Sequence, residues 1–451
     1  MIDVLANYIR KLLPKNKFAR SVSVLVGGTA GSQILLVLAA PILTRLYTPE
    51  DFGLLAAFAA LLALLTVVAS ARYELAVPLP ESDQDAANIV VLGGLCVILT
   101  TGASLIVVLL WARQIADFIN APGLAGYCWL VPVGVFFIGF YQVFNKWAVR
   151  TKNFGHIART RIWQTLSILA IQIGAFKYGA VALIGGQALG QGVGASSLAM
   201  KAITRPELKN WTWRDVKQQA YRYRDFPLYS TWTGLLNTAS LQLAPLVFIA
   251  LYGATVAGLY ALTLRILSMP ISLIGNAVGS VFLSEAPAAK RQGTLSDLVG
   301  KLHSKLAMAG SLPLAVLLFF GPDLFALIFG EQWRKAGQYS QWMAPWIYLQ
   351  FQWSPLSTLA SVLELQREAL VSQVVTLAVR FGVLVVAYRY ALIADTAVLL
   401  FAIVSAIAYL IRMFWFLNRA GLAVKNIVLA DLKFAIPVIV AFSVLRYFML
   451  G

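Results

Sequence analysis

The residues of this chain that point to chemistry are basic side chains inside long apolar stretches. They are Arg72, Lys146, Arg265, Arg380 and Arg412, and the only clear acid within the same stretches is Glu74. An ionised side chain at the centre of a bilayer costs roughly 2.5–3.5 kcal/mol, so such residues usually face a cavity. The excess of positive charge therefore predicts a cationic cavity that binds an anion.

Snorkelling of the charged end to a membrane interface is the alternative for each of these residues. It is favoured for Lys146 and Arg412, which lie within five residues of predicted cytoplasmic helix ends. Arg265 and Arg380 lie eight and twelve residues into their stretches, where escape is harder, and Arg72 is intermediate. Arg265, Arg380 and Arg72 are therefore the predicted anion-binding residues.

Polar side chains recur at helical spacing beside these arginines. The predicted stripes are Arg265, Ser268, Ser272, Asn276 and Gly279; Gln373, Thr376 and Arg380; and Ser230, Thr233, Asn237 and Ser240 or Leu241. Serine and threonine in membrane helices often bond their own preceding turn, which is the structural alternative. We interpret the three stripes together as the wall of a cavity.

One further face is rich in tryptophan and amide groups, at Trp342, Trp346, Gln350 and Trp353. Tryptophan near a helix end normally belongs to the interfacial belt, which accounts for Trp342. Trp353 lies at mid-helix beside glutamines, where a flat ring and amide groups suit a sugar. The predicted glycan contacts are Asn237, Ser272, Asn276, Gln350, Trp353 and Gln373.

Glu74 is the predicted coupling carboxylate if the protein uses a proton gradient. A structural ion pair with another helix is an equal alternative for this residue.

The overall composition indicates a polytopic membrane protein. Of the 451 residues, 60% are hydrophobic and only 12% are charged, against roughly 25% charged in soluble domains. The net charge of +17 does not imply nucleic acid, because cations gather in the cytoplasmic loops of membrane proteins. The two cysteines lie in apolar stretches, and we interpret His156 and His303 as solvated loop residues. No catalytic, metal or cofactor motif is expected, and Gly190–Ala195 is predicted to serve close helix packing.

Apolar runs of about 20 residues predict an all-α protein with thirteen membrane spans. They are 22–43, 54–77, 87–111, 124–149, 162–178, 180–200, 227–251, 258–283, 306–320, 339–363, 369–388, 396–417 and 434–450. With the N-terminus inside, the predicted inner segments hold 24 lysines and arginines and the outer segments hold 6. This bias predicts a cytoplasmic N-terminus.

A weak internal repeat relates two segments at an offset of 205 residues. Leu46-Tyr47, Gly53-Leu54 and Ala56 align with Leu251-Tyr252, Gly258-Leu259 and Ala261. Two six-helix lobes, 22–200 and 227–417, are therefore predicted about an axis along the membrane normal, with 201–226 as a basic linker. Residues 1–21 are predicted to form an interfacial amphipathic helix, with a solvated tail as the alternative. Within 418–451, the short last run is predicted to cross outward, with a helix along the inner surface as the alternative.

Several segments together resemble a known family. They are GSQILLVLAAPILTRLYTPEDFG and RYELAVPLP between Gly31 and Pro80, then YQVFNKWAVRTKNFG, YRDFPLYSTWTGLLN and FGEQW. Over roughly residues 15–417 the chain resembles the Wzx-type oligosaccharide flippases, in the polysaccharide-biosynthesis branch of the multidrug/oligosaccharidyl-lipid/polysaccharide exporters. The resemblance implies a bacterial inner-membrane protein that moves an undecaprenyl-diphosphate-linked oligosaccharide (an O-antigen, capsule or exopolysaccharide unit) from the cytoplasmic to the periplasmic leaflet.

The resemblance also suggests interaction partners for the protein, and it can be compared with alternative functions. Membrane lipids are expected partners, a polysaccharide polymerase or export machinery is a further candidate, and nucleic acid is not expected. Arginine forks suit a diphosphate, which assigns Arg265, Arg380 and Arg72 to the head group. The alternatives are a multidrug or other lipid-linked exporter and, less favoured, a membrane polymerase or glycosyltransferase.

Overall fold

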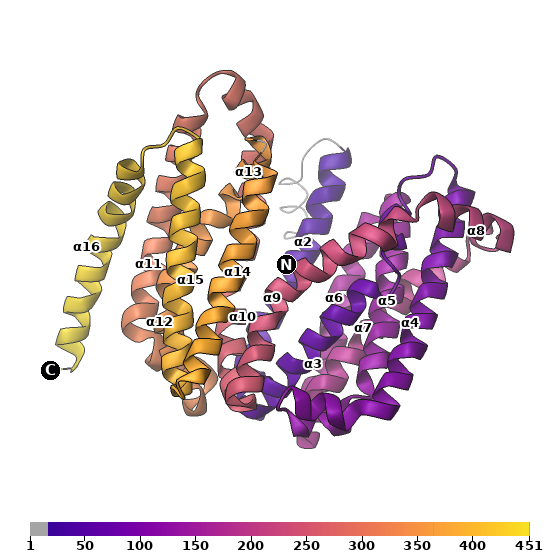
Figure 1. Ribbon diagram of the computed structural model, residues 1–451, viewed down its shortest axis with the longest axis horizontal. Helices are drawn as coiled ribbons and strands as arrows, with labels where there is room; N and C mark the ends of the chain where they lie inside the picture. Colours follow the sequence, from indigo (N-terminus) through magenta and orange to yellow (C-terminus); the bar gives the residue numbers. More distant parts are fainter. Residues whose placement is uncertain (1–16, 364, 451) are drawn as a thin grey trace, which may run out of the picture. The chain divides into compact units, whose positions relative to one another are not determined.

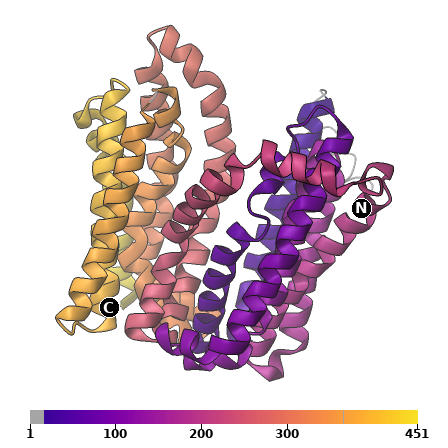
Figure 2. The ribbon, with the colours of Figure 1, turned by 45° about the vertical axis from the view of Figure 1, so that its right-hand side comes forward.

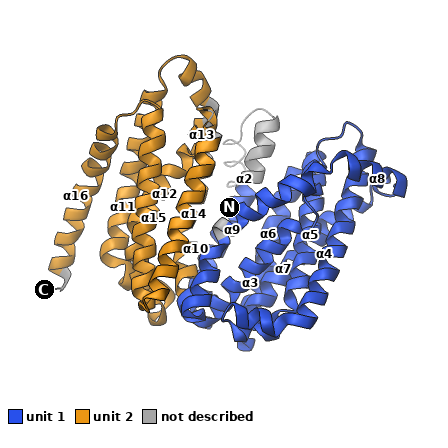
Figure 3. Cartoon of the chain, viewed as in Figure 1, with its two compact units in different colours: residues 1–258 blue, residues 259–451 orange. Residues whose placement is uncertain are grey.

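The computed structural model describes residues 17–363 and 365–450. Contacts within the chain divide it into two compact units, 1–258 and 259–451 (Figure 3). This division assigns the helix at 231–252 to the first unit, because that helix packs on the helix at 49–68. The symmetric lobes 22–200 and 227–417 stay a prediction.

The first unit is a bundle of long helices joined by short turns (Figure 1). In chain order the long helices are α2 (Lys17–Leu46), α3 (Pro49–Val68), α4 (Asp83–Phe118), α5 (Leu130–Arg150), α6 (Phe154–Gly174), α7 (Ala180–Ile203) and α9 (Thr231–Tyr252). The shorter elements are η1 (Tyr73–Ala76), η2 (Pro122–Tyr127), η3 (Phe176–Tyr178), η4 (Pro206–Leu208), α8 (Trp213–Arg222) and the π-helical η5 (Phe226–Ser230). The first turn of α10 (Ala254–Arg291) also belongs to this unit, and the rest of that helix begins the second.

The second unit continues from α10 with five more long helices. They are α11 (Leu295–Phe329), α12 (Arg334–Leu356), α14 (Gln366–Arg389), α15 (Ala394–Arg419) and α16 (Val424–Leu450), with short η6 (Glu331–Trp333) and α13 (Leu359–Val362) between them. Figures 1 and 2 show these helices running side by side, with α14 beside α15 and α11 beside α12. Helix α16 packs chiefly on α11.

The expected all-α membrane architecture is confirmed. Each of the thirteen predicted runs coincides over most of its length with one long helix in the described part of the chain, although the run 54–77 extends past the end of α3 at Val68. Eight described helices are long and apolar enough to cross a bilayer by length and composition, and a ninth joins them if the bent α9 segment counts as one span. Helices α5, α6, α7 and α12 do not reach that hydropathy, and each of them carries many side chains buried among neighbouring helices.

The glycine-rich face of α7 serves close packing, as predicted. A Cβ added at Gly190 would lie 2.8 Å from the backbone nitrogen of Ile168, and one at Gly194 would lie 2.3 Å from the amide carbon of Gln164. Both contacts are made with α6. Only glycine lets the two helices approach to this distance, so the run is not a phosphate-binding loop.

The turn between α2 and α3 is fixed by its own polar residues. The backbone nitrogen of Asp51 donates to Thr48 Oγ1 at 3.2 Å, and that of Thr48 donates to Asp51 Oδ2 at 2.9 Å, which is a capping box. Pro49 occupies the first turn of α3, where its missing N–H costs nothing. The Tyr47 hydroxyl donates to the Gln172 carbonyl and ties the turn to α6.

The repeated glycines contact each other's segments reciprocally. A Cβ on Gly53 would lie 1.9 Å from the Ala254 carbonyl oxygen, and one on Gly258 would lie 1.8 Å from the Pro49 carbonyl oxygen. Residues 49 and 254, like 53 and 258, are related by the same offset of 205 found in the sequence. Such reciprocity is what a local two-fold relation between the first turns of α3 and α10 produces.

A buried polar cluster holds α16 against the rest of the second unit. Asp431 Oδ1 accepts hydrogen bonds from the Tyr348 hydroxyl at 3.0 Å and from Gln352 Nε2 at 2.9 Å. His303 Nε2 lies 3.8 Å from Asp431 Oδ2. The prediction that His303 is a solvated loop residue is wrong, because α11 begins at Leu295 and buries this ring to 1% exposure.

The FGEQW segment proves to be a structural turn. Gly330 adopts φ +106°, a conformation that glycine reaches without strain, and Trp333 is fully buried behind it. Arg334 bridges Glu331 and Asp323 on the surface, and its hydrogen bond holds the pKa of Glu331 below the usual range.

The reciprocal glycine contact gives a prediction with an internal control. Gly53→Ala and Gly258→Ala should each lower the free energy of unfolding by about 1–3 kcal/mol, because the new methyl group meets backbone oxygen. Gly102→Ala is the matched control, since nothing lies within 4 Å of its added Cβ. Alanine alone favours a helix by about 1 kcal/mol over glycine, so the control should be neutral or stabilised. Thermal unfolding of the purified proteins in detergent measures all three, and equal melting temperatures would contradict the contact.

Candidate functional site

The second predicted span ends earlier than its hydropathy indicates. Helix α3 stops at Val68, and Ala71 and Arg72 follow with φ of +49° and +62°. The left-handed region costs roughly 1–2 kcal/mol for a residue with a Cβ. Arg72 therefore lies in a strained break and Glu74 lies in the 3-10 helix η1 that follows it, so the expectation that both belong to one continuous membrane helix is wrong.

This break brings Arg72 and Glu74 together. Arg72 Nη1 lies 3.6 Å from Glu74 Oε1, and the Ser70 hydroxyl donates to the other carboxylate oxygen. Glu74 is 3% exposed, whereas the side chain of Arg72 keeps 22% of its surface accessible. The carboxylate is thus enclosed, and the guanidinium is the accessible member of the pair.

Arg72 also lies directly across α9. A Cβ built on Gly234 would be 1.9 Å from Arg72 Nη2, so the missing side chain of Gly234 provides the space for the guanidinium. Arg72 Nε is buried and has no hydrogen-bond partner among the described atoms. The predicted α9 stripe lies on the same helix: Asn237 is exposed, and Thr233 Oγ1 donates to the Tyr229 carbonyl.

Arg150 at the end of α5 supports the loop that follows the break. Its guanidinium donates to the carbonyl oxygens of Pro80 at 2.6 Å and Glu81 at 3.2 Å, and pairs with Asp83 at 2.8 Å. The two sequence motifs RYELAVPLP and YQVFNKWAVRTKNFG therefore contact each other. They position the break around Arg72 and need not touch a ligand to do so.

In the second unit Arg380 is held by aromatic rings. Its Cζ atom lies 4.6 Å from the ring centroids of both Trp346 and Phe401, and Tyr260 is a further neighbour. A desolvated cation–π contact is worth about 2 kcal/mol. In the described part of the chain Arg380 forms no ion pair with an acid, and its Nε is buried without a hydrogen-bond partner.

Arg265 on α10 is partly buried and likewise has no ion pair among the described residues. Within its predicted stripe, Ser268 and Ser272 donate to backbone carbonyls three residues earlier, at Arg265 and Met269. These two hydroxyl groups follow the structural alternative, although Ser272 stays exposed. The side chains of Asn276, Ser240 and Leu241 lie outside the described part.

The predicted glycan wall is only partly accessible. Trp353 is 7% exposed and packs on Phe416, with ring centroids 5.2 Å apart, inside the hydrophobic core of the second unit. Gln350 is partly buried, and its Oε1 has no partner among the described atoms. Gln373 on α14 is exposed. The positions of Gln350 and Gln373 suit a ligand contact better than that of Trp353.

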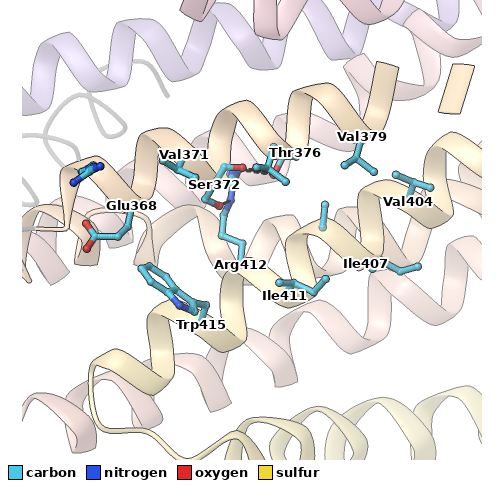
Figure 4. A pocket seen from close by; sticks show the side chains of 13 residues that line it. Glu368, Val371, Ser372, Thr376, Val379, Val404, Ile407, Ile411, Arg412 and Trp415 are labelled. Atoms are coloured by element: carbon cyan, nitrogen blue, oxygen red, sulfur yellow. Dashed lines mark hydrogen bonds between the residues drawn. The ribbon is translucent and has the colours of Figure 1, made fainter. Parts of the chain in front are cut away.

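Arg412 is a residue that sequence reasoning set aside. Its guanidinium contacts α14: Nε donates to Ser372 Oγ at 2.9 Å, and Nη2 donates to the Ser372 carbonyl at 2.9 Å and Thr376 Oγ1 at 2.8 Å (Figure 4). Ser372 and Thr376 are one helical turn apart, and this spacing was the sequence signal for a polar contact on α14. The position of Arg412 near a predicted helix end favoured snorkelling instead.

No group of three or more histidine, cysteine or acidic side chains that could hold a metal ion occurs among the described residues. In the first unit Arg72 is held by one carboxylate, and in the second unit Arg380 is held by aromatic rings and Arg412 by hydroxyl groups and a backbone carbonyl.

Comparison with models of known protein families identifies the family of this chain. A family model described as polysaccharide biosynthesis protein matches residues 42–338, more than half of the chain. The chain belongs to this family. A search of curated protein sequences gives no match.

Solved structures with a similar fold are known. The chain is similar to the lipid II flippase MurJ in an inward closed conformation, with 12% identity over 93% of this chain and 92% of that one, and a TM-score of 0.73. It is also similar to a multidrug resistance MATE transporter of the MOP superfamily, inward-facing at 14% identity, 88% and 94% coverage and a TM-score of 0.56. The outward-facing form gives 16% identity, 89% and 96% coverage and a TM-score of 0.51. At these identities the likeness establishes the fold.

The contact of the Arg72 guanidinium with α9 at Gly234 can be tested by a double-mutant cycle. Gly234→Ala should lower the free energy of unfolding by about 1–3 kcal/mol, because the methyl group displaces the guanidinium from the enclosed Glu74. In an Arg72→Ala background the same substitution should have no such cost, since nothing remains to be displaced. Thermal unfolding of the four proteins gives the coupling, and an equal effect of Gly234→Ala in both backgrounds would show that Arg72 does not lie there.

Proposed function

We propose that this protein moves an undecaprenyl-diphosphate-linked oligosaccharide from the cytoplasmic to the periplasmic leaflet of a bacterial inner membrane. The observation that carries the proposal is the pair of arginines, Arg265 and Arg380, on membrane helices without an acidic partner among the described residues. An unpaired cation in a membrane helix is costly, and a ligand diphosphate would neutralise it. Membership of the polysaccharide biosynthesis family supports a saccharide-bearing anion.

The fold supports translocation as the activity. One protein with a similar fold is named for flipping lipid II, and the others for multidrug resistance. In the proposed mechanism the polyprenyl chain stays at the lipid-facing surface while the head group crosses beside Arg265 and Arg380, and Arg72 is a further proposed contact of the head group. Alternating opening of the two predicted lobes exposes the head group to each side in turn, and no covalent step is required.

A multidrug exporter is the second candidate, because of the MATE likeness. Cationic drugs favour acidic binding residues, and the one enclosed acid of the Arg72 break is already paired. A polymerase or glycosyltransferase would need catalytic groups that the sequence does not predict. A polysaccharide polymerase or export complex is a proposed partner, placed at the periplasmic side where the product emerges.

Neutralising the unpaired arginines tests the proposal. In proteoliposomes holding undecaprenyl-diphosphate-linked oligosaccharide, Arg265→Ala and Arg380→Ala should each reduce translocation at least about tenfold, the effect of one lost charge-assisted contact. Lysine at either position should restore part of the rate, because the charge remains but the bidentate fork is lost. Access of the sugar to a membrane-impermeant oxidant measures crossing.

Arg389→Ala is the matched control, an exposed cation at the far end of α14 from the cytoplasmic side. Full translocation by both alanine variants would remove these arginines from the site. Export of a cationic dye, without movement of the oligosaccharide, would favour the multidrug alternative.

Glu74→Gln in the same vesicles should lose dependence on a pH gradient if Glu74 couples transport to protons, and unchanged dependence would eliminate that role.

The proposed orientation places the C-terminus in the periplasm. Helix α16 has 27 residues, ten more than the predicted last run, and spans about 40 Å at about 1.5 Å per residue. That length is sufficient for a hydrocarbon layer of about 30 Å. Alkaline phosphatase fused after Gly451 should be active, and green fluorescent protein at the same site should be dark. A fluorescent, phosphatase-negative pair would place the end of the chain in the cytoplasm.

A further inference from the structure

An apolar groove runs between α14 and α15 within the second unit. Its volume is about 690 Å³, and all of its lining residues come from these two helices (Figure 4). The walls are branched aliphatic side chains one turn apart: Val371, Val375 and Val379 on α14, and Val404, Ile407 and Ile411 on α15. Val375 and Ile411 are 53% and 62% exposed, so the groove is open along its length.

One end of this groove is polar. Arg412 lies in it with Nε and Nη2 committed to Ser372 and Thr376, while Nη1 has no hydrogen-bond partner among the described residues. Arg367 and Glu368 at the start of α14 and Trp415 near the end of α15 line the same end. Two arginines and one glutamate leave this end with a net charge of +1. The bonds to α14 fix the guanidinium, so its free nitrogen is presented with little loss of side-chain freedom.

In the orientation predicted from the sequence, the polar end lies at the cytoplasmic surface. The segment before α14 is predicted to be an inner loop, and α15 is predicted to end inside. The groove therefore starts at the head-group level of the inner leaflet and continues toward the bilayer centre. It covers the thirteen residues from Arg367 to Val379, or about 20 Å of helix.

We propose that this groove binds the polyprenyl chain of the lipid-linked substrate, with the adjoining phosphate at Arg412. This inference rests on the proposed function. The charge and shape of the groove support this assignment. The cationic end suits a phosphate, and a single groove between two helices suits a lipid with one chain. A two-chain phospholipid would leave its second chain outside. The groove is thus a loading site that holds the tail while the head group enters the protein.

The first experiment uses undecaprenyl diphosphate that carries a photoreactive group in its tail and no sugar. The purified protein is reconstituted in nanodiscs of phosphatidylethanolamine and phosphatidylglycerol, irradiated, and mapped by mass spectrometry. Cross-links are expected on 371–379 and 404–411. Unlabelled undecaprenyl diphosphate should suppress them, whereas an equal excess of phosphatidylglycerol should not.

Substitutions in the groove provide the second arm. Val375→Trp fills the groove and should abolish these cross-links and lower oligosaccharide translocation about tenfold or more, whereas Val385→Trp, equally exposed on the same helix outside the groove, should do neither. Arg412→Gln should weaken binding of undecaprenyl diphosphate about tenfold and leave binding of the uncharged undecaprenol nearly unchanged.

The outcomes separate this inference from the proposed function. Cross-links that phosphatidylglycerol suppresses equally, or that map elsewhere, would show a groove filled by bulk lipid and overturn the inference. So would a Val375→Trp protein that behaves like Val385→Trp. Specific cross-links in the groove, in a protein that moves no oligosaccharide, would support lipid binding here and contradict the proposed function instead.

Discussion

The structure depends on one constraint: a guanidinium among membrane helices must find its partners within the protein, because hydrocarbon offers none. Three of the arginines meet the constraint in different ways. Arg72 uses the enclosed Glu74 and the open backbone of Gly234. Arg380 uses two aromatic rings, and Arg412 uses the hydroxyls of Ser372 and Thr376. Rings and hydroxyls hold the charge without cancelling it, so the fold keeps positive charge available for an anion.

Most of the residues that carry the family resemblance determine backbone geometry rather than binding. Thr48, Pro49 and Asp51 start α3, and Gly53 allows it to meet α10. Arg150 holds the loop that follows the Arg72 break, and Gly330 with Trp333 builds the turn before α12. These are positions at which a cap, a close approach or a left-handed conformation is required. The family is thus recognisable from its turns, whereas a particular substrate would be selected by side chains between them.

The sequence predicted the helices well because length and hydropathy determine a membrane span. It also predicted the packing role of the α7 glycines and the offset that relates Gly53 to Gly258. It misplaced the end of the second span, since Leu75, Ala76 and Val77 continue the apolar run while the backbone has already turned at Ala71. His303 was misjudged, and the partners of Arg412 were not foreseen, for a shared reason. Their partners Asp431 and Ser372 are distant in sequence, and only tertiary packing brings them together. Local patterns identify which residues carry charge but do not identify what each charge meets.

The cluster around Asp431 has a consequence for how the second unit assembles during synthesis. Translation proceeds from the N-terminus, so His303, Tyr348 and Gln352 are all synthesised before Asp431 emerges with α16. Until then the Gln352 amide lacks this acceptor, at a cost of about 1–3 kcal/mol for an unsatisfied buried group, and the Tyr348 hydroxyl keeps only its 3.5 Å bond to the Ala307 carbonyl. Helix α16 therefore supplies an acceptor that the interior of this unit otherwise lacks, so the buried amide of Gln352 can gain this bond only after α16 has been inserted.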